Sequence, residues 1–345
     1  MTRLKDIAQR AGLAVMTVSK ALRDKPDVSA ATKARVKLLA QQMGYLPDSS
    51  AQGLRTRKTK LFGLVVSSMT NPVYSRVVLA IEERAHELGY GVLLAHTLNV
   101  PEREEACIRQ LVSRRVDGLF IAPVYRLTAE ARIYQELFHR GIPTVLLGHP
   151  APFCSQFVHV ETDDLMASYT VTQHLLKLGH KRIAFFTGPL VTPWTQERLE
   201  GYRRALREAG LDVDDKLIFQ AGRTIEEGAK AASQMLGESS DATAVQAVND
   251  MVAVGGADTL LNHGLKIPQD LSVAGFGNIL LGKHFRVSLT TTRQPKFHLG
   301  STAVELMQQF LGGQRPESRR LPAELIIRAS TAAPPQSQKP RASKT

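Results

Sequence analysis

The first 45 residues show the apolar spacing of three short helices, and a glycine separates the first two. A first helix is expected over residues 2–10 and a second over residues 15–22, with Gly12 in the turn between them. A third helix follows Ser29, a good N-cap residue, and ends near Gly44. The first helix repeats its apolar positions at helical intervals, at Leu4, Ile7, Ala8 and Ala11. Two short helices joined by a glycine turn predict a helix-turn-helix.

The charge of the chain is concentrated in the same region. Residues 1–60 contain 13 lysines and arginines and four acidic residues, whereas residues 61–330 contain 28 of each. The last 15 residues add three basic residues, and the whole chain carries +12. A local basic region is typical of a surface that binds a polyanion. The head is therefore predicted to bind DNA, and a basic protein-interaction module is the alternative.

The start and outer face of the second helix carry the side chains expected to meet DNA. Val15 and Met16 are suited to thymine methyl groups, and Lys20 to the guanine edge. Short hydroxyl side chains suited to phosphate are Thr17, Ser19 and Thr32.

A basic segment with an apolar leucine connects the head to the rest of the chain. It covers residues 48–60 and includes Leu54 and the run from Thr56 to Lys60. A leucine in such a segment can act as a wedge in the minor groove, where it unstacks a base step. A plain solvated linker fits the composition equally well.

From Leu61 onwards, apolar strands alternate with helices. Strands are expected at 61–66, 90–95, 118–122 and 143–147, and the series restarts with strands at 182–186, 217–219, 244–248 and 272–276. Helices separate them, beginning with 72–88 and including 163–178 in the restarted series. Such alternation predicts parallel sheets. The fold class is therefore α/β, with two similar lobes over residues 61–330.

The remaining features favour a cytoplasmic binding protein over an enzyme or an exported receptor. The N-terminus is charged and has no secretory signal, and no apolar run is long enough to span a bilayer. Cys107 and Cys154 lack metal-type spacing. Nucleophile-elbow, P-loop and zinc-protease motifs are missing from the sequence. We therefore expect no catalytic residue, no metal and no cofactor.

Several ordered motifs together resemble the LacI/GalR family of bacterial transcriptional regulators. They are Lys5-Asp-Ile-Ala, Thr17-Val-Ser-Lys-Ala-Leu22, Val28-Ser29, Gly44-Tyr-Leu-Pro47 and Leu54-Arg55. The resemblance implies a head over 1–47, a hinge helix and linker over 48–60, and a two-lobed core of the type I periplasmic-binding-protein kind over 61–330. It makes Leu54 a minor-groove lever, and adds Leu4, Tyr45, Gln52 and Arg55 to the DNA-binding residues. Lys20 and Asp48 depart from the family, which usually has Arg and Asn there.

The resemblance also implies a ligand cleft between the lobes. The expected ligand-contacting residues are Asn71, Tyr74, His149, Asp163, Trp194, Arg198, Asn249 and Asn278. Where the family usually has an acid after the last strand, this chain has Gly277. Loss of that carboxylate beside Arg198 would leave its positive charge less compensated, so an anionic sugar derivative is the first hypothesis. A neutral ligand bound through Asn278 or His284 is the alternative.

The resulting expectation is a ligand-responsive regulator, most simply a repressor. Two chains would pair through their cores and place two heads on a near-palindromic operator. Ligand binding would change lobe closure and so bias hinge-helix formation. The helix over 297–311 is expected to return to the first lobe after a crossover near 289–295, as the resemblance implies. The tail over 331–345 is rich in Pro, Ser and Lys and is expected to be disordered.

Overall fold

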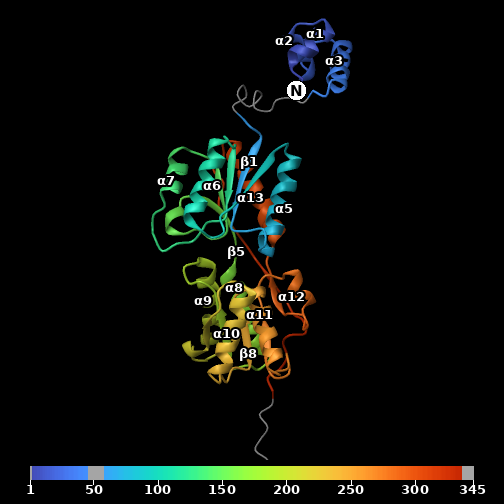
Figure 1. Ribbon diagram of the computed structural model, residues 1–345. Coiled ribbons are helices and arrows are strands. Elements are labelled where there is room, and N and C mark those ends of the chain that lie inside the picture. Colours follow the sequence, from blue (N-terminus) through green and yellow to red (C-terminus); the bar gives the residue numbers. More distant parts are fainter. Residues whose placement is uncertain (1, 46–57, 336–345) are drawn as a thin grey trace, which may run out of the picture. The chain divides into compact units, whose positions relative to one another are not determined.

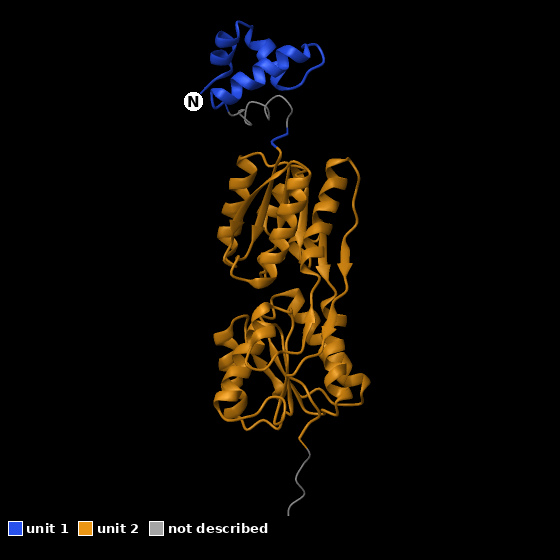
Figure 2. Ribbon diagram, turned by 90° about the vertical axis from the view of Figure 1, so that its right-hand side faces the viewer, with its two compact units in different colours: residues 1–59 blue, residues 60–345 orange. Residues whose placement is uncertain are grey.

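The computed structural model describes residues 2–45 and 58–335 and divides the chain into two compact units. Residues 1–59 form one unit and residues 60–345 the other (Figure 2). Pro47, Asp48, Gln52, Leu54 and Arg55 lie outside the described residues, so the hinge prediction stays a prediction.

The head consists of three helices around a small apolar core. They are α1 (Leu4–Ala11), α2 (Val15–Leu22) and α3 (Ala30–Gln42). Gly12 ends α1 with φ +64°, a left-handed conformation that glycine adopts without strain. The Ser29 hydroxyl caps α3 by accepting the N–H of Thr32. Ile7, Val18 and Val36 are fully buried at the centre of the core, one from each helix.

The first lobe of the second unit is built on a six-stranded parallel sheet. Its strand order is β11-β5-β4-β3-β1-β2, with α5, α6, α7 and α13 packed on its faces (Figure 1). The strands are β1 (Leu61–Val66), β2 (Gly91–His96), β3 (Gly118–Ile121), β4 (Thr144–Leu147), β5 (Val158–Thr162) and β11 (Arg319–Leu321), and the helices are α5 (Pro72–Glu87), α6 (Pro101–Ser113), α7 (Arg132–His139) and α13 (Lys296–Leu311). A 3-10 turn, Pro152–Cys154, precedes β5.

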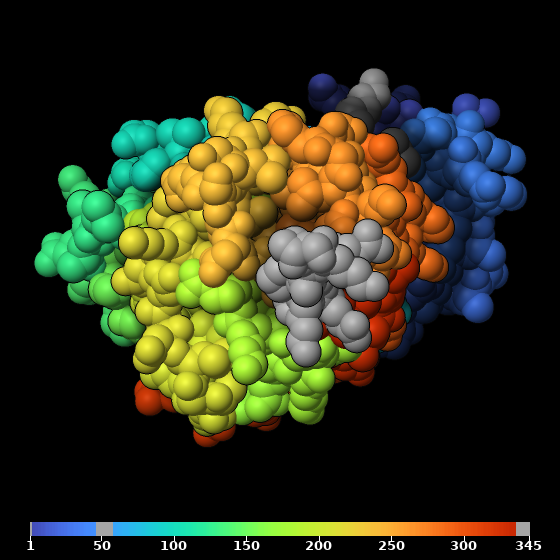
Figure 3. Space-filling view, turned by 90° about the horizontal axis from the view of Figure 1, so that it is seen from below, coloured from blue at the N-terminus to red at the C-terminus, as the bar shows by residue number. Residues whose placement is uncertain are grey.

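The second lobe has a four-stranded parallel sheet in the order β7-β6-β8-β9. The strands are β6 (Ile183–Thr187), β7 (Ile218–Gln220), β8 (Ala244–Ala247) and β9 (Ser272–Ala274), and the helices are α8 (Asp164–Lys177), α9 (Pro193–Glu208), α10 (Ile225–Gly237), α11 (Asp250–Asn262) and α12 (Leu280–His284). A 3-10 turn, Asp215–Leu217, leads into β7. Figure 3 shows the end of this lobe, where the yellow and orange segments that include α10 and α11 lie side by side.

The chain passes between the lobes at three places. It leaves the first lobe from β5 into α8, and returns from β10 (Thr291–Arg293) into α13. It crosses again from β11 to β12 (Glu324–Ile326), which pairs antiparallel with β10. The expected return of the helix after residue 295 is confirmed, because α13 packs on α5, β4 and β5 of the first lobe.

The start of the tail is ordered, contrary to the expectation of disorder from residue 331. The carbonyl oxygen of Ala332 accepts hydrogen bonds from His180 Nε2 (2.8 Å) and Ser272 Oγ (3.1 Å). The hydroxyl of Thr331 bonds to Thr290 and His174. These polar contacts attach residues 331–332 to the second lobe, although the tail over 331–345 has the composition of a disordered segment. In the part of the chain that the structure describes, no helix is long and apolar enough to cross a bilayer.

Candidate functional site

The exposed start of α2 presents two apolar side chains in an otherwise polar setting. Val15 is 46% exposed and Met16 64% exposed, whereas Val18 and Ala21 of the same helix are buried. Ala14 at the N-cap offers no side-chain acceptor, so the first N–H groups of α2 are open to phosphate oxygens. This end of the helix therefore has the geometry expected of a groove-reading face.

The polar residues predicted to face DNA hold partners within the head. Lys20 pairs with Asp27, and Arg23 donates to the hydroxyl and carbonyl oxygens of Ser19. Thr32 bonds to Ser29. Leu4 and Tyr45 are partly buried against the head core, and Thr17 is partly exposed.

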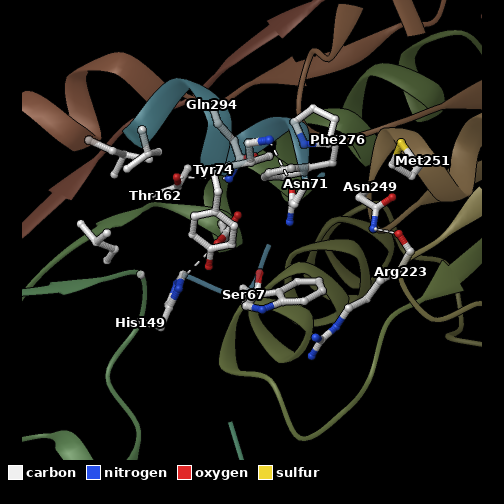
Figure 4. A pocket seen from close by; sticks show the side chains of 18 of the residues that line it. Ser67, Asn71, Tyr74, His149, Thr162, Arg223, Asn249, Met251, Phe276 and Gln294 are labelled. Carbon is white, nitrogen blue, oxygen red and sulfur yellow. Dashed lines mark hydrogen bonds and ion pairs between the residues drawn. The ribbon is translucent and has the colours of Figure 1, made fainter. Parts of the chain in front are cut away.

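A cavity of about 380 Å³ lies between the two lobes of the second unit. Figure 4 shows Tyr74, Thr162 and His149 on one side and Asn249 and Arg223 on the other. These residues sit where strands end or helices begin, which is where ligands bind in open α/β sheets. Asn71 caps α5 by accepting the N–H of Val73 at 3.0 Å, and Asn249 caps α11 by accepting that of Val252 at 2.8 Å. The ends of strands and the starts of helices from both lobes thus line one cavity.

Six of the eight residues expected to contact ligand line this cavity. They are Asn71, Tyr74, His149, Trp194, Arg198 and Asn249. The structure places Asp163 outside the lining, because its carboxylate turns back to accept the N–H of Met166 at 3.2 Å as the cap of α8. The next residue, Asp164, lines the cavity instead.

Asn278 also lies outside the cavity lining. Its side-chain oxygen accepts a hydrogen bond from Arg328 Nη2 at 2.6 Å. The preceding Gly277 has φ +133°, so an L-residue would be strained at this position. A carboxylate side chain could therefore be restored at 277 only with backbone strain.

Arg198 is fully engaged by groups of its own lobe. Its Nε and Nη2 donate to Asp164 Oδ1 at 2.9 and 2.7 Å, and Nη1 donates to the carbonyl oxygen of Val248 at 2.6 Å. The guanidinium carbon lies 3.6 Å from the centre of the Phe276 ring. Arg198 and Asp164 are both more than nine-tenths buried. Arg198 therefore keeps a carboxylate partner, Asp164, although Gly277 supplies no carboxylate.

His149 lies among three carboxylates where the lobes meet. Its Nε2 is 3.1 Å from Glu197 Oε2, 3.6 Å from Asp164 Oδ2 and 3.7 Å from Glu161 Oε2. Burial alone would lower the pKa of His149, but the hydrogen bond with Glu197 and the charges of Asp164 and Glu161 outweigh it, so the pKa is raised. Arg320 on β11 bonds to both Glu161 and Glu197. Ion pairs thus connect the two lobes beside the cavity.

Four charged residues of the lining are not among the expected ligand contacts. Asp164 and Asp250 adjoin expected residues, whereas Glu161 and Arg223 were missed altogether. Glu161 lies on β5, a strand whose polar sequence His-Val-Glu-Thr has no apolar run to reveal it. Arg223 follows β7 after two small residues, so inspection of the residues beyond every expected strand would have found it.

Comparison with known proteins agrees with this arrangement. Residues 3–48 match the family model of bacterial regulatory proteins, lacI family, and residues 59–330 match the model of periplasmic binding proteins and the sugar binding domain of the LacI family. The chain is 33% identical to the HTH-type transcriptional repressor CytR of Escherichia coli K12 over 334 residues, which are 96% of this chain and 97% of the relative.

Two solved structures are similar over the same length. One is the lac repressor dimer bound to operator and the anti-inducer ONPF, with a TM-score of 0.86 and 27% identity over 96% of this chain and 99% of that one. The other is the transcriptional regulator CelR in complex with cellobiose, with a TM-score of 0.72 and 28% identity over 96% and 100%. The family models together cover most of both units. The chain therefore belongs to the LacI family of bacterial transcriptional regulators.

Proposed function

We propose that a small polar effector, a sugar or sugar derivative, binds in the cavity between the lobes and sets the affinity of the heads for operator DNA. The observation that carries this proposal is the cavity itself, whose polar lining is contributed by both lobes. A ligand that contacts both walls favours one relative position of the lobes, and it can shift an equilibrium only by its difference in affinity for the two states. The similar structures hold operator, an anti-inducer and cellobiose, which support both partners.

On the DNA side, we propose that a homodimer places two copies of α2 in successive major grooves of a near-palindromic operator. Val15, Met16 and Lys20 would contact base edges, while Thr17, Ser19 and Thr32 would contact phosphates. The contacts proposed for Gln52, Leu54 and Arg55 belong to the hinge segment. Lys20 must exchange Asp27 for a base or phosphate acceptor, so the pair with Asp27 would reduce the net gain from that contact.

The test uses the full chain and an operator obtained by selection from random duplex DNA. A thermal-shift screen of sugars, sugar acids, sugar phosphates and nucleobases identifies a ligand, and fluorescence anisotropy then measures operator affinity with and without it. We expect a change in operator Kd of about 5- to 150-fold, and an equal change in ligand affinity when operator is bound. A ligand that binds in the cavity but leaves the operator Kd unchanged would refute the proposal.

A further inference from the structure

Two buried polar atoms of the cavity lining have no hydrogen-bond partner. Among the described residues, four buried side-chain nitrogen or oxygen atoms are without a partner, and two of them belong to the lining. One is an acceptor, Glu161 Oε2, on a strand of the first lobe, and the other is a donor, Arg223 Nε, in the second lobe. Buried polar groups are nearly always satisfied by protein, water or ligand, so these two atoms are available to a ligand that displaces water from the cavity.

Among the described residues, the guanidinium of Arg223 forms no ion pair within 4 Å, and Glu227 acts on it only as a nearby charge. Within the described residues its guanidinium makes no hydrogen bond, and its nearest assigned partner is the face of Trp194, 5.7 Å from Cζ to the ring centre. The neighbouring carboxylate of Glu227 is committed to the backbone N–H groups of Arg223 and Thr224 at 2.6 and 2.9 Å. Burial lowers the pKa of Arg223, so an anion beside it would offset the cost of burying its charge.

The backbone around Arg223 is nevertheless well fixed. Its carbonyl oxygen accepts the side-chain amide of Asn249, as Figure 4 shows, at 3.3 Å, and its N–H is held by Glu227. The guanidinium therefore projects from an anchored segment, and its removal should not disturb the fold. Arg198 contrasts with it, since all three of its donor nitrogens have acceptors within the protein.

Glu161 has one oxygen occupied and one free for a donor. Oε1 accepts the Nε of Arg320 at 2.7 Å. Oε2 lies 3.7 Å from His149 Nε2 and 3.8 Å from His159 Nε2, and both distances are too long for a hydrogen bond. A carboxylate oxygen accepts a hydroxyl well and repels an anion. The wall near Glu161 therefore suits the hydroxyl groups of a ligand, and the wall near Arg223 suits its negative charge.

We propose that the effector is a polyhydroxylated anion, a sugar acid or a sugar phosphate, whose carboxylate or phosphate binds Arg223 and whose hydroxyl group donates to Glu161. This inference rests on the proposed function, since it names the chemical class of the same cavity's ligand. Because the two side chains belong to different lobes, one such ligand would join both walls.

The test exploits Trp194, the only tryptophan in the chain and a neighbour of Arg223 in the cavity. Inorganic phosphate is titrated into the DNA-free full-length protein at constant ionic strength, followed by the emission of Trp194. We expect a saturable change that is weakened about 10- to 100-fold in R223Q and less in R223K, which retains the charge. R207Q, which removes an exposed arginine paired with Glu200, is the matched control and should behave as wild type.

A second arm compares acids with their neutral parents: glucuronate with glucose, and ribose 5-phosphate with ribose. The anionic member of the tighter-binding pair should bind at least about tenfold more tightly. E161Q keeps an oxygen for Arg320 but removes the free acceptor, so it should weaken that sugar anion while leaving inorganic phosphate unaffected.

No saturable response to phosphate in the wild type, equal phosphate binding by R223Q, or a neutral sugar that binds as tightly as its acid would each overturn the inference. A neutral sugar that binds and changes operator affinity would overturn it while supporting the proposed function. Conversely, Arg223-dependent phosphate binding, with sugar anions that bind but never alter operator affinity, would support the site and refute the function.

Discussion

Removal of the Asp164 carboxylate should strongly destabilise the two-lobed core. In D164A, the buried guanidinium of Arg198 keeps only the carbonyl oxygen of Val248 and loses two donated hydrogen bonds. Leaving one partner of a buried ion pair uncompensated costs about 3–5 kcal/mol. In a domain of this size, about 1 kcal/mol changes the Tm by roughly 2 °C or more, so the Tm should fall by at least about 6 °C.

Thermal unfolding of the full chain, followed by the emission of Trp194, measures this effect in the core alone, because the head contains no tryptophan. D215A is the matched control: it breaks the pair between Arg203 and an aspartate that is 80% exposed, and exposed pairs contribute little. The double variant D164A/R198M should be more stable than D164A, since it no longer buries an unpaired charge. A fall in Tm for D164A no larger than that for D215A would refute the reasoning. It would mean that Asp164 does not stabilise the buried charge of Arg198.

Two further predictions concern pH and DNA. Since the folded-state pKa of His149 is raised, its contribution to stability is fully present below its unfolded pKa of about 6.5 and is lost as pH rises through the folded value. The Tm advantage of wild type over H149Q should therefore shrink between pH 6 and pH 8.5, and an advantage that grows with pH would contradict the assignment. M16A should weaken operator binding by roughly tenfold in fluorescence anisotropy without changing the Tm, because Met16 is exposed in the head and its proposed role is contact with bases. L38A, which truncates another exposed apolar side chain of the head, should bind operator as wild type does, and equal losses in the two variants would count against readout by α2.

The elements that the sequence predicts well are those whose burial pattern is strong. The apolar run Leu61–Val66 is buried along nearly its whole length, and the alternation that follows it identifies both lobes. The strand Val158–Thr162 was not predicted, because only three of its five residues are buried and its sequence is largely polar. The strands β10, β11 and β12 have three residues each and lie outside the alternation of strands and helices that predicts the equally short β7 and β9. The crossover between lobes came from family resemblance, since no local pattern encodes it.

The ion pairs of the cavity could not be predicted from the order of residues in the sequence, and the reason is physical. In the sequence, the missing acid at Gly277 predicts a less compensated charge at Arg198, since both belong to motifs of the ligand cleft. In the folded chain, Coulomb interactions and hydrogen bonds act over a few ångströms, and Asp164, 34 residues away in the sequence, occupies that range around Arg198. The unpaired cation is instead Arg223, whose nearest carboxylate is already committed to backbone N–H groups. The same class of ligand, an anion, follows from both arguments, but only the second identifies a residue whose replacement should abolish the preference.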